Sequence, residues 1–201
     1  MTDDALQAAI EDDYETELSR LGSSKALYAI TEGEMETATV LASLADGMAA
    51  AAETFGGWAD DDGDDAVAAS AAGTATDLAE RIAGAADGAE PTASPTPVDE
   101  VLRGLDDPDA RLGGLLAWTM ITDRTLAQAV GFFVGNADTR AAELFRDLRS
   151  AVDDLRSETT AGLDSADAEV ARAAAGEVVE AAYGHYVEAL EGMGVKVKPV
   201  C

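Results

Sequence analysis

The sequence predicts an all-α protein, built as an antiparallel helical bundle with an additional N-terminal helix. Alanine is abundant, aromatic residues make up only 5% of the chain, and alternating Val, Ile or Thr is nearly absent, which together favour helices over strands. Long periodic segments are separated by short loops, so packing between antiparallel neighbours is the simplest arrangement. The 201 residues can bury a sizeable core, and we expect a single domain over residues 1–201.

Glycine, proline and acidic turns set the bounds of the predicted elements. Helices are expected over residues 3–30, 37–59, 65–86, 98–105, 109–134, 138–160 and 167–193. They group into an N-terminal helical segment, a first helix pair, a second helical half and a C-terminal tail, over residues 1–31, 37–86, 109–193 and 194–201. The first helix is expected to bend near Gly22, and an acidic turn over residues 60–64 separates the helix pair. Three prolines identify residues 87–97 as a crossover linker.

The charge of the chain predicts adaptation to concentrated salt. Forty acidic residues against thirteen basic ones give a formal net charge of -27. Surface carboxylates retain water and cations, while molar salt screens the repulsion among them. We therefore expect a halophilic protein that gathers solvent cations at its acidic surface and loosens in dilute buffer.

The same composition disfavours several partners and locations. Nucleic acid and anionic membranes would be repelled at low salt, because phosphate binding relies on Lys and Arg. No stretch approaches the roughly 18 apolar residues of a membrane span, and the first residues lack the features of a signal peptide. We expect a cytoplasmic protein that binds neither nucleic acid nor membrane. Cys201, the only cysteine, is expected to be a free thiol outside any disulfide or metal site.

Helical periodicity assigns core and solvent faces. The core stripe of the helix over residues 37–59 consists of Leu41, Leu44, Met48, Ala52 and Phe55. The nearly opposite face consists of Asp46, Ala50, Glu53 and Gly57, so Glu53 is expected to point to solvent. Core stripes of the helices over residues 65–86 and 138–160 consist of Val67, Ala71, Leu78, Ile82 and Ala85, and of Ala141, Leu144, Leu148, Val152 and Leu155.

Three ionisable residues fall on or beside apolar faces and are candidates for a residual polar or metal site. Asp123 lies near the centre of an apolar helix face, where an ionised carboxylate needs a partner. Either Thr122 or Asp123 caps a helix that restarts at Arg124, or Asp123 pairs with an arginine, or it belongs to a functional site. Glu17 lies in the stripe of the N-terminal helix, at a boundary position or in such a site. His185, the only histidine, is a structural or surface-paired residue or a metal ligand.

Several short motifs resemble a known family. The first helix pair contains Ala45-Asp46-Gly47-Met48, Glu53-Thr54-Phe55, Trp58-Ala59 and Glu80-Arg81-Ile82. These motifs are similar to the first helix pair of rubrerythrin-like proteins in the ferritin-like superfamily. Further motifs over residues 21–27, 131–138 and 198–201 resemble a haloarchaeal group of such proteins. The resemblance spans most of the chain and implies a ferritin-like bundle, which in the family holds two irons through a Glu on one helix and Glu-x-x-His on the next.

The resemblance also implies where such ligands would lie. Alignment with the family places Met48 at the first Glu, and Ala75 and Leu78 at the Glu-x-x-His pair. All three lie on predicted core faces, and no Glu-x-x-His occurs anywhere in the sequence. We therefore expect the fold without its metal site, with no catalytic, cofactor-binding or metal-binding residues and no cofactor.

Three functional hypotheses follow. The first is a non-catalytic bundle that acts through association, as a homodimer or with a partner protein. The alternative is a divergent di-metal oxidoreductase, with iron or manganese held by some of Glu17, Asp77, Asp123 and His185. The third is nucleic-acid or transcription-related binding, for which the sequence offers no basic patch, aromatic platform or helix-turn-helix pattern. Nucleophile-elbow, phosphate-loop and catalytic-triad patterns are absent from the sequence.

Overall fold

The computed structural model describes residues 3–61, 65–86 and 90–197, which form α-helices joined by turns and loops, with no strand among them. In chain order these are α1 (Asp3–Asp13), α2 (Glu15–Leu21), α3 (Ser24–Ile30), α4 (Thr37–Asp61), α5 (Ala66–Ala85), α6 (Pro97–Arg103), α7 (Pro108–Gly135), α8 (Thr139–Leu163) and α9 (Ala168–Gly192). The all-α helical bundle predicted from the sequence is confirmed. None of the helices in these ranges is long and apolar enough to cross a membrane.

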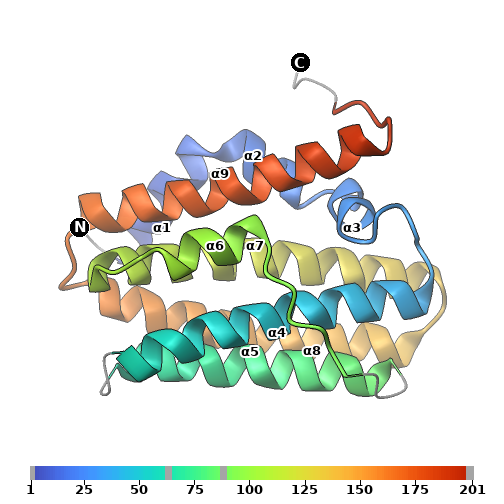
Figure 1. Cartoon of the computed structure of the whole chain (residues 1–201), viewed down its shortest axis with the longest axis horizontal. Coiled ribbons are helices and arrows are strands. Elements are labelled where there is room, and N and C mark those ends of the chain that lie inside the picture. The colour runs from blue at the N-terminus through green and yellow to red at the C-terminus, as the bar shows by residue number, and fades with distance from the viewer. Residues whose placement is uncertain (1–2, 62–64, 87–89, 198–201) are drawn as a thin grey trace.

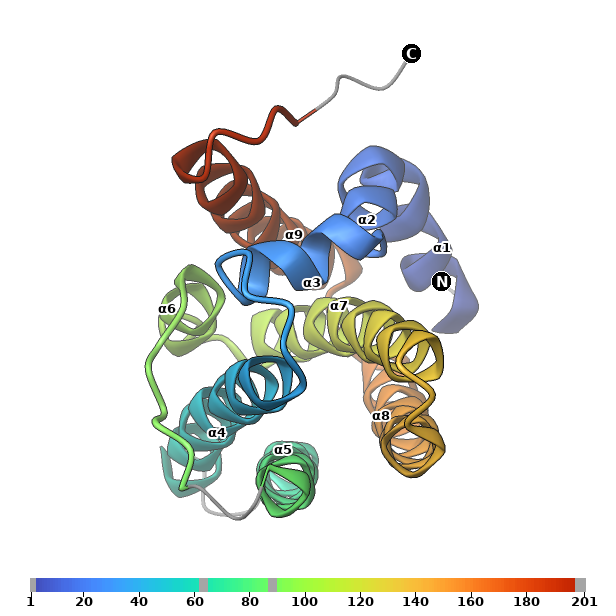
Figure 2. The ribbon, with the colours of Figure 1, turned by 90° about the vertical axis from the view of Figure 1, so that its right-hand side faces the viewer.

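Four long helices form two antiparallel pairs that lie side by side (Figures 1 and 2). One pair is α4 with α5, the other is α7 with α8, and the two pairs meet where α5 packs against α8. The connection from α5 to α7 includes α6 and crosses the length of the bundle (Figure 1). As a result, α7 starts at the end of the bundle opposite to the one where α5 stops.

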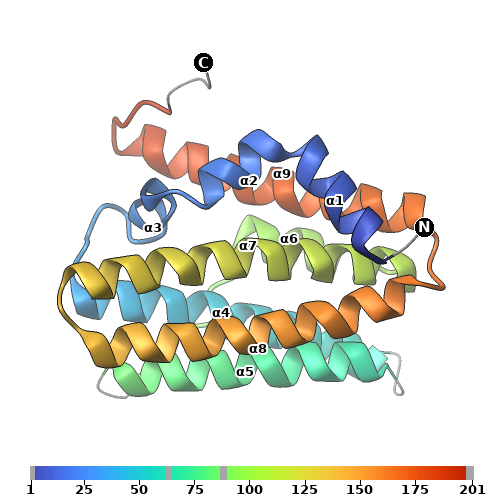
Figure 3. The same cartoon turned by 180° about the vertical axis from the view of Figure 1, so that it is seen from behind.

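The remaining helices cover one side of this arrangement. Helix α9 packs against α7, and α6 lies between α4 and α9 (Figure 2). The short helices α1, α2 and α3 pack across α9 and α7 from the outside (Figure 3). Thus α7 has neighbours on nearly every side, and its residues 113–120 are buried without interruption. A helix that is apolar all round belongs in the middle of a protein.

Aspartate side chains cap the N-termini of most of the long helices. Aspartate side chains accept hydrogen bonds from backbone N–H groups in the first turns of α5, α7, α8 and α9, at Asp65, Asp107, Asp138 and Asp167. At the start of α6, Thr96 and Asp99 form a capping box around Pro97. Such a cap satisfies N–H groups that the helix leaves unpaired and typically contributes about 1 kcal/mol. Part of the acidic composition therefore fixes helix starts in addition to solvating the surface.

The crossing of α7 and α9 requires glycine at one position. A Cβ atom added at Gly113 would lie 2.0 Å from the carbonyl oxygen of Ala171 and 2.5 Å from its carbonyl carbon. Both distances are far below van der Waals contact, and the neighbour is backbone, which has no rotamer to adopt instead. The two helices therefore approach each other as closely as their main chains allow.

The predicted helix bounds agree with the observed ones to within three residues, except in the N-terminal segment. There the sequence predicts one bent helix over residues 3–30, whereas the chain forms three short helices. The bend near Gly22 is confirmed, but the break at Tyr14 is not predicted. Tyr14 leaves the helical conformation, with φ -118° and ψ 29°, where its ring packs against Gly176 of α9. The cause is thus a tertiary contact with a residue far away in the sequence.

Ala50 lies opposite the predicted core stripe of α4 and is nevertheless fully buried. Helix α6 packs on this side of α4, and Arg103 donates from Nε to Thr54 Oγ1 at 3.2 Å. The linker is fastened to the same helix, because Asp46 accepts hydrogen bonds of 2.7 and 3.0 Å from Thr92. Glu53, on the same predicted face, is exposed as expected.

Some expectations fall on residues that the structure does not describe. These are parts of the acidic turn over residues 60–64 and of the linker over residues 87–97, and the end of the C-terminal tail with Cys201. For them the sequence-based predictions stand as predictions.

We expect Gly113→Ala to lower the free energy of unfolding by about 3 kcal/mol, because the new methyl group forces α7 and α9 apart. Gly131→Ala is the matched control on the same helix, since a Cβ atom there would meet nothing within 4 Å. Replacing an exposed helical glycine by alanine raises the free energy of unfolding by roughly 0.5–1 kcal/mol. Denaturant unfolding in several molar KCl measures both variants, and equal stabilities would contradict the close crossing.

Candidate functional site

The positions that the family resemblance assigns to metal ligands are filled with hydrocarbon. Met48, Ala75 and Leu78 are 7%, 0% and 0% exposed and belong to one apolar core. In the same core, the rings of Phe55 and Trp118 meet edge to face with centroids 5.1 Å apart, which joins α4 to α7. The interior between the helix pairs is therefore packed with alkyl, thioether and aromatic groups.

These residues do not fit a di-metal centre. Iron and manganese prefer carboxylate oxygen and imidazole nitrogen, whereas a thioether is a soft ligand and an alkyl group offers no lone pair. Over residues 3–61, 65–86 and 90–197, no three side chains of His, Cys, Asp or Glu lie close enough together to hold an ion. A ferritin-like di-metal site has no ligand set among these residues.

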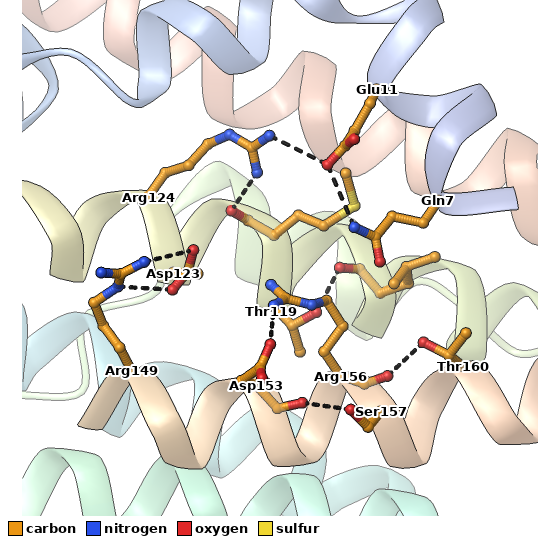
Figure 4. Close-up of polar contacts among 12 residues, drawn as sticks. Gln7, Glu11, Thr119, Asp123, Arg124, Arg149, Asp153, Arg156, Ser157 and Thr160 are labelled. Carbon is orange, nitrogen blue, oxygen red and sulfur yellow. Dashed lines mark hydrogen bonds and ion pairs between the residues drawn. The ribbon is translucent and has the colours of Figure 1, made fainter. Parts of the chain in front are cut away.

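Asp123 forms an ion pair with Arg149 of α8 (Figure 4). Arg149 donates from Nε to Oδ1 at 2.8 Å and from Nη2 to Oδ2 at 3.3 Å, so the contact is bidentate. Helix α7 runs through this position without a break, which excludes a helix restart at Arg124. The hydrogen bond to Asp123 raises the pKa of Arg149 above its usual value, although burial opposes the shift. Of the explanations open for Asp123, pairing with an arginine is the one observed.

The other candidate residues are not gathered around Asp123. Asp77 is exposed on α5 and pairs with Arg81 at 3.3 Å, and His185 is exposed on α9. Glu17 is half-buried on α2. The break at Tyr14 changes the register of α2, so that Leu18, at 2% exposure, takes the core position instead. Glu17 is thus a boundary residue, as one of its two interpretations predicts.

Polar contacts that the sequence does not reveal fasten the N-terminal helices to the bundle. Arg124 of α7 donates to the carbonyl oxygen of Met120 and pairs with Glu11 of α1 at 3.5 Å (Figure 4). Arg172 of α9 donates from Nε to Asp13 at 2.8 Å. Both arginines lie more than a hundred residues from their partners, and such pairings have no signal in local periodicity.

Tyr14, between α1 and α2, makes a third contact that fastens the N-terminal helices to the bundle. Its hydroxyl donates to Glu180 at 3.4 Å and lies where a Cβ atom at Gly176 would come within 2.3 Å. Burial is the largest cause that raises the pKa of the Tyr14 phenol above 10.0, followed by the negative charge of Glu180 and, more weakly, Asp13 and Glu17. The neutral phenol is thus the form that fits the folded chain.

A groove of about 470 Å³ lies at the end of the bundle where α4 and α8 begin and α5 ends. Its apolar lining includes Leu41, Ala141 and Leu144, and its charged lining includes Arg81 and Arg140. Because these residues come from three helices, no single stretch of the sequence indicates the groove. Its volume lies within the range of small-molecule sites.

Comparison of the chain with known protein families, with curated proteins and with solved structures found no match.

We expect the Asp123–Arg149 pair to show a coupling energy of about 0.5–1 kcal/mol in a double-mutant cycle with alanine, because the contact is bidentate and the Asp123 side chain is only 21% exposed. The exposed Asp77–Arg81 pair, spaced i,i+4 on α5, is the control and should give roughly 0.3–0.5 kcal/mol. Denaturant unfolding measures both cycles. A coupling of zero between Asp123 and Arg149 would show that the contact adds nothing to the fold.

Tyr14 should make the stability of the protein fall at alkaline pH. Since the folded-state pKa is raised above 10.0, the contribution of Tyr14 is complete below the unfolded-state pKa and is lost as the pH rises through the folded-state value. Between about pH 9 and about pH 11, the wild type should lose more stability than Tyr14→Phe. Tyr183→Phe, which removes a phenol from α9, serves as the control. Parallel pH profiles of wild type and Tyr14→Phe would refute the raised pKa.

Proposed function

We propose that this chain is a ferritin-like helical bundle without a metal site, which acts through association with a second copy of itself and not through catalysis. The observation that carries the proposal is the hydrocarbon at Met48, Ala75 and Leu78, where an iron-binding relative would present oxygen and nitrogen ligands. The net charge of -27 supports a place in the salt-rich cytoplasm of a halophilic archaeon. The proposal includes neither nucleic acid nor membrane as a partner.

The arrangement of the long helices supports the ferritin-like part of the proposal. Two antiparallel pairs, α4 with α5 and α7 with α8, are joined by a connection that runs the length of the bundle. The same order of a helix pair, a long crossover and a second pair characterises ferritin-like bundles. With the N-terminal helices and α9 packed on one side, the opposite side of α4 and α5 stays uncovered by any described element (Figure 2).

An exposed glycine of α5 supports association through the first helix pair. Gly73 is exposed within this helix, and a Cβ atom there would meet nothing within 4 Å. Glycine inside a helix lowers stability by roughly 0.5–1 kcal/mol relative to alanine, and no contact among the described residues explains why glycine is present here. A second helix that approaches closely would account for it, as small residues allow close packing of main chains.

Sedimentation equilibrium and element analysis, both in several molar KCl, test the proposal. We expect a molar mass of twice 20.6 kDa and far less than one iron or manganese per chain. Gly73→Leu should shift the protein toward the monomer while its helical circular dichroism is retained, because leucine is a better helix former than glycine. Gly131→Leu, at an exposed glycine of α7, should leave the dimer intact. Stoichiometric metal, or a mass of 20.6 kDa at all concentrations, would overturn the proposal.

A further inference from the structure

The groove at the end of the bundle combines an apolar floor with a charged rim. Leu41 and Ala141 are buried at 3% and 6% exposure, and Leu144 is half-buried. The rim carries the guanidinium groups of Arg81, from the last turns of α5, and Arg140, from the first turn of α8. The volume of about 470 Å³ falls within the roughly 300–1,000 Å³ of small-molecule sites.

Two cations at one groove are unusual in this chain, because positive charge is scarce. Residues 26–80 contain no Lys or Arg, so Arg81 is the first cation after Lys25. It pairs with Asp77 at 3.3 Å and with Asp147 at 3.8 Å, which leaves further N–H donors of its five. Arg81 is thereby held in place at the rim while part of its guanidinium stays available.

Arg140 is the more available of the two arginines. It is exposed and makes no hydrogen bond or ion pair with any other described residue. The carboxylate nearest to it in the lining, Asp138, already accepts a hydrogen bond of 2.9 Å from the backbone N–H of Ala141 as the cap of α8. The positive ends of α4 and α8 also meet the groove, against one negative end from α5, so the helix termini add to the attraction for an anion.

We propose that this groove binds a small organic carboxylate. Its alkyl part would lie on Leu41, Ala141 and Leu144, and its carboxylate would accept hydrogen bonds from Arg140, with Arg81 beside it. A guanidinium matches a carboxylate in a bidentate arrangement, and the apolar floor takes a hydrocarbon chain that a mineral anion lacks. This site lies at the end of the bundle where α5 stops, whereas the proposed dimer contact at Gly73 lies nearer the middle of α5.

Titration with potassium octanoate in several molar KCl, followed by amide proton–nitrogen correlation spectra, tests the site. We expect saturable shifts confined to residues 37–41, 81–85 and 138–144. Arg140→Gln should weaken binding about tenfold through loss of the charge-assisted hydrogen bonds. Arg146→Gln, at an exposed arginine of α8 outside the groove, should leave it unchanged.

Two further variants test the apolar part without touching a charge. Gly84 lines the groove, and a Cβ atom there would meet nothing within 4 Å, so Gly84→Ala should bind octanoate as the wild type does. Gly84→Phe should fill the groove and abolish binding. The amide signals of residues outside the groove should keep their wild-type positions, which shows that the fold is retained. Absence of saturable shifts, equal affinity for octanol and octanoate, or equal affinities of Arg140→Gln and Arg146→Gln would each overturn the proposal.

Discussion

The burial of α7 on nearly every side is the constraint on which the rest of the structure depends. Residues 112–122 contain no charged side chain, and glycine at position 113 lets the main chain of α9 come into direct contact. Because α8 and α9 both pack along α7, the positions of these helices follow from it. The single acid near its middle, Asp123, is tolerated because Arg149 reaches it from α8.

Acidic residues serve this arrangement in two ways that respond differently to salt. Aspartates at helix starts bond to backbone N–H groups of their own helix, a short-range contact that salt weakens little. Pairs such as Asp13 with Arg172 join separate helices at the surface, and screening weakens them. At molar salt the repulsion within a chain of net charge -27 is also screened. The caps and the apolar core then carry most of the stability.

The sequence predicts those parts of the fold that depend on neighbouring residues. The bounds of α4, α5, α7, α8 and α9 follow from local periodicity and turn residues, and Asp123 needs a partner wherever its helix lies. The break at Tyr14 and the burial of Ala50 are set by Gly176 and by α6, which local periodicity does not bring near them. Of the candidate site, the sequence indicates the hydrocarbon interior at Met48 and Leu78. The groove at Arg140 is lined by residues of three helices, and the helical periodicity of the sequence does not indicate which helix ends lie next to one another.

The contact between Tyr14 and Glu180 joins residues 166 positions apart, which has a consequence for how the chain is made. During synthesis the amino end leaves the ribosome first, and α4 with α5 can pair as soon as both have emerged. The helices α1, α2 and α3 pack on α7 and α9, so their apolar side chains have no surface to cover until α7 and α9 have been translated. During synthesis, this N-terminal segment stays unpacked for the longest time and is therefore the part of the nascent chain most accessible to proteases and chaperones.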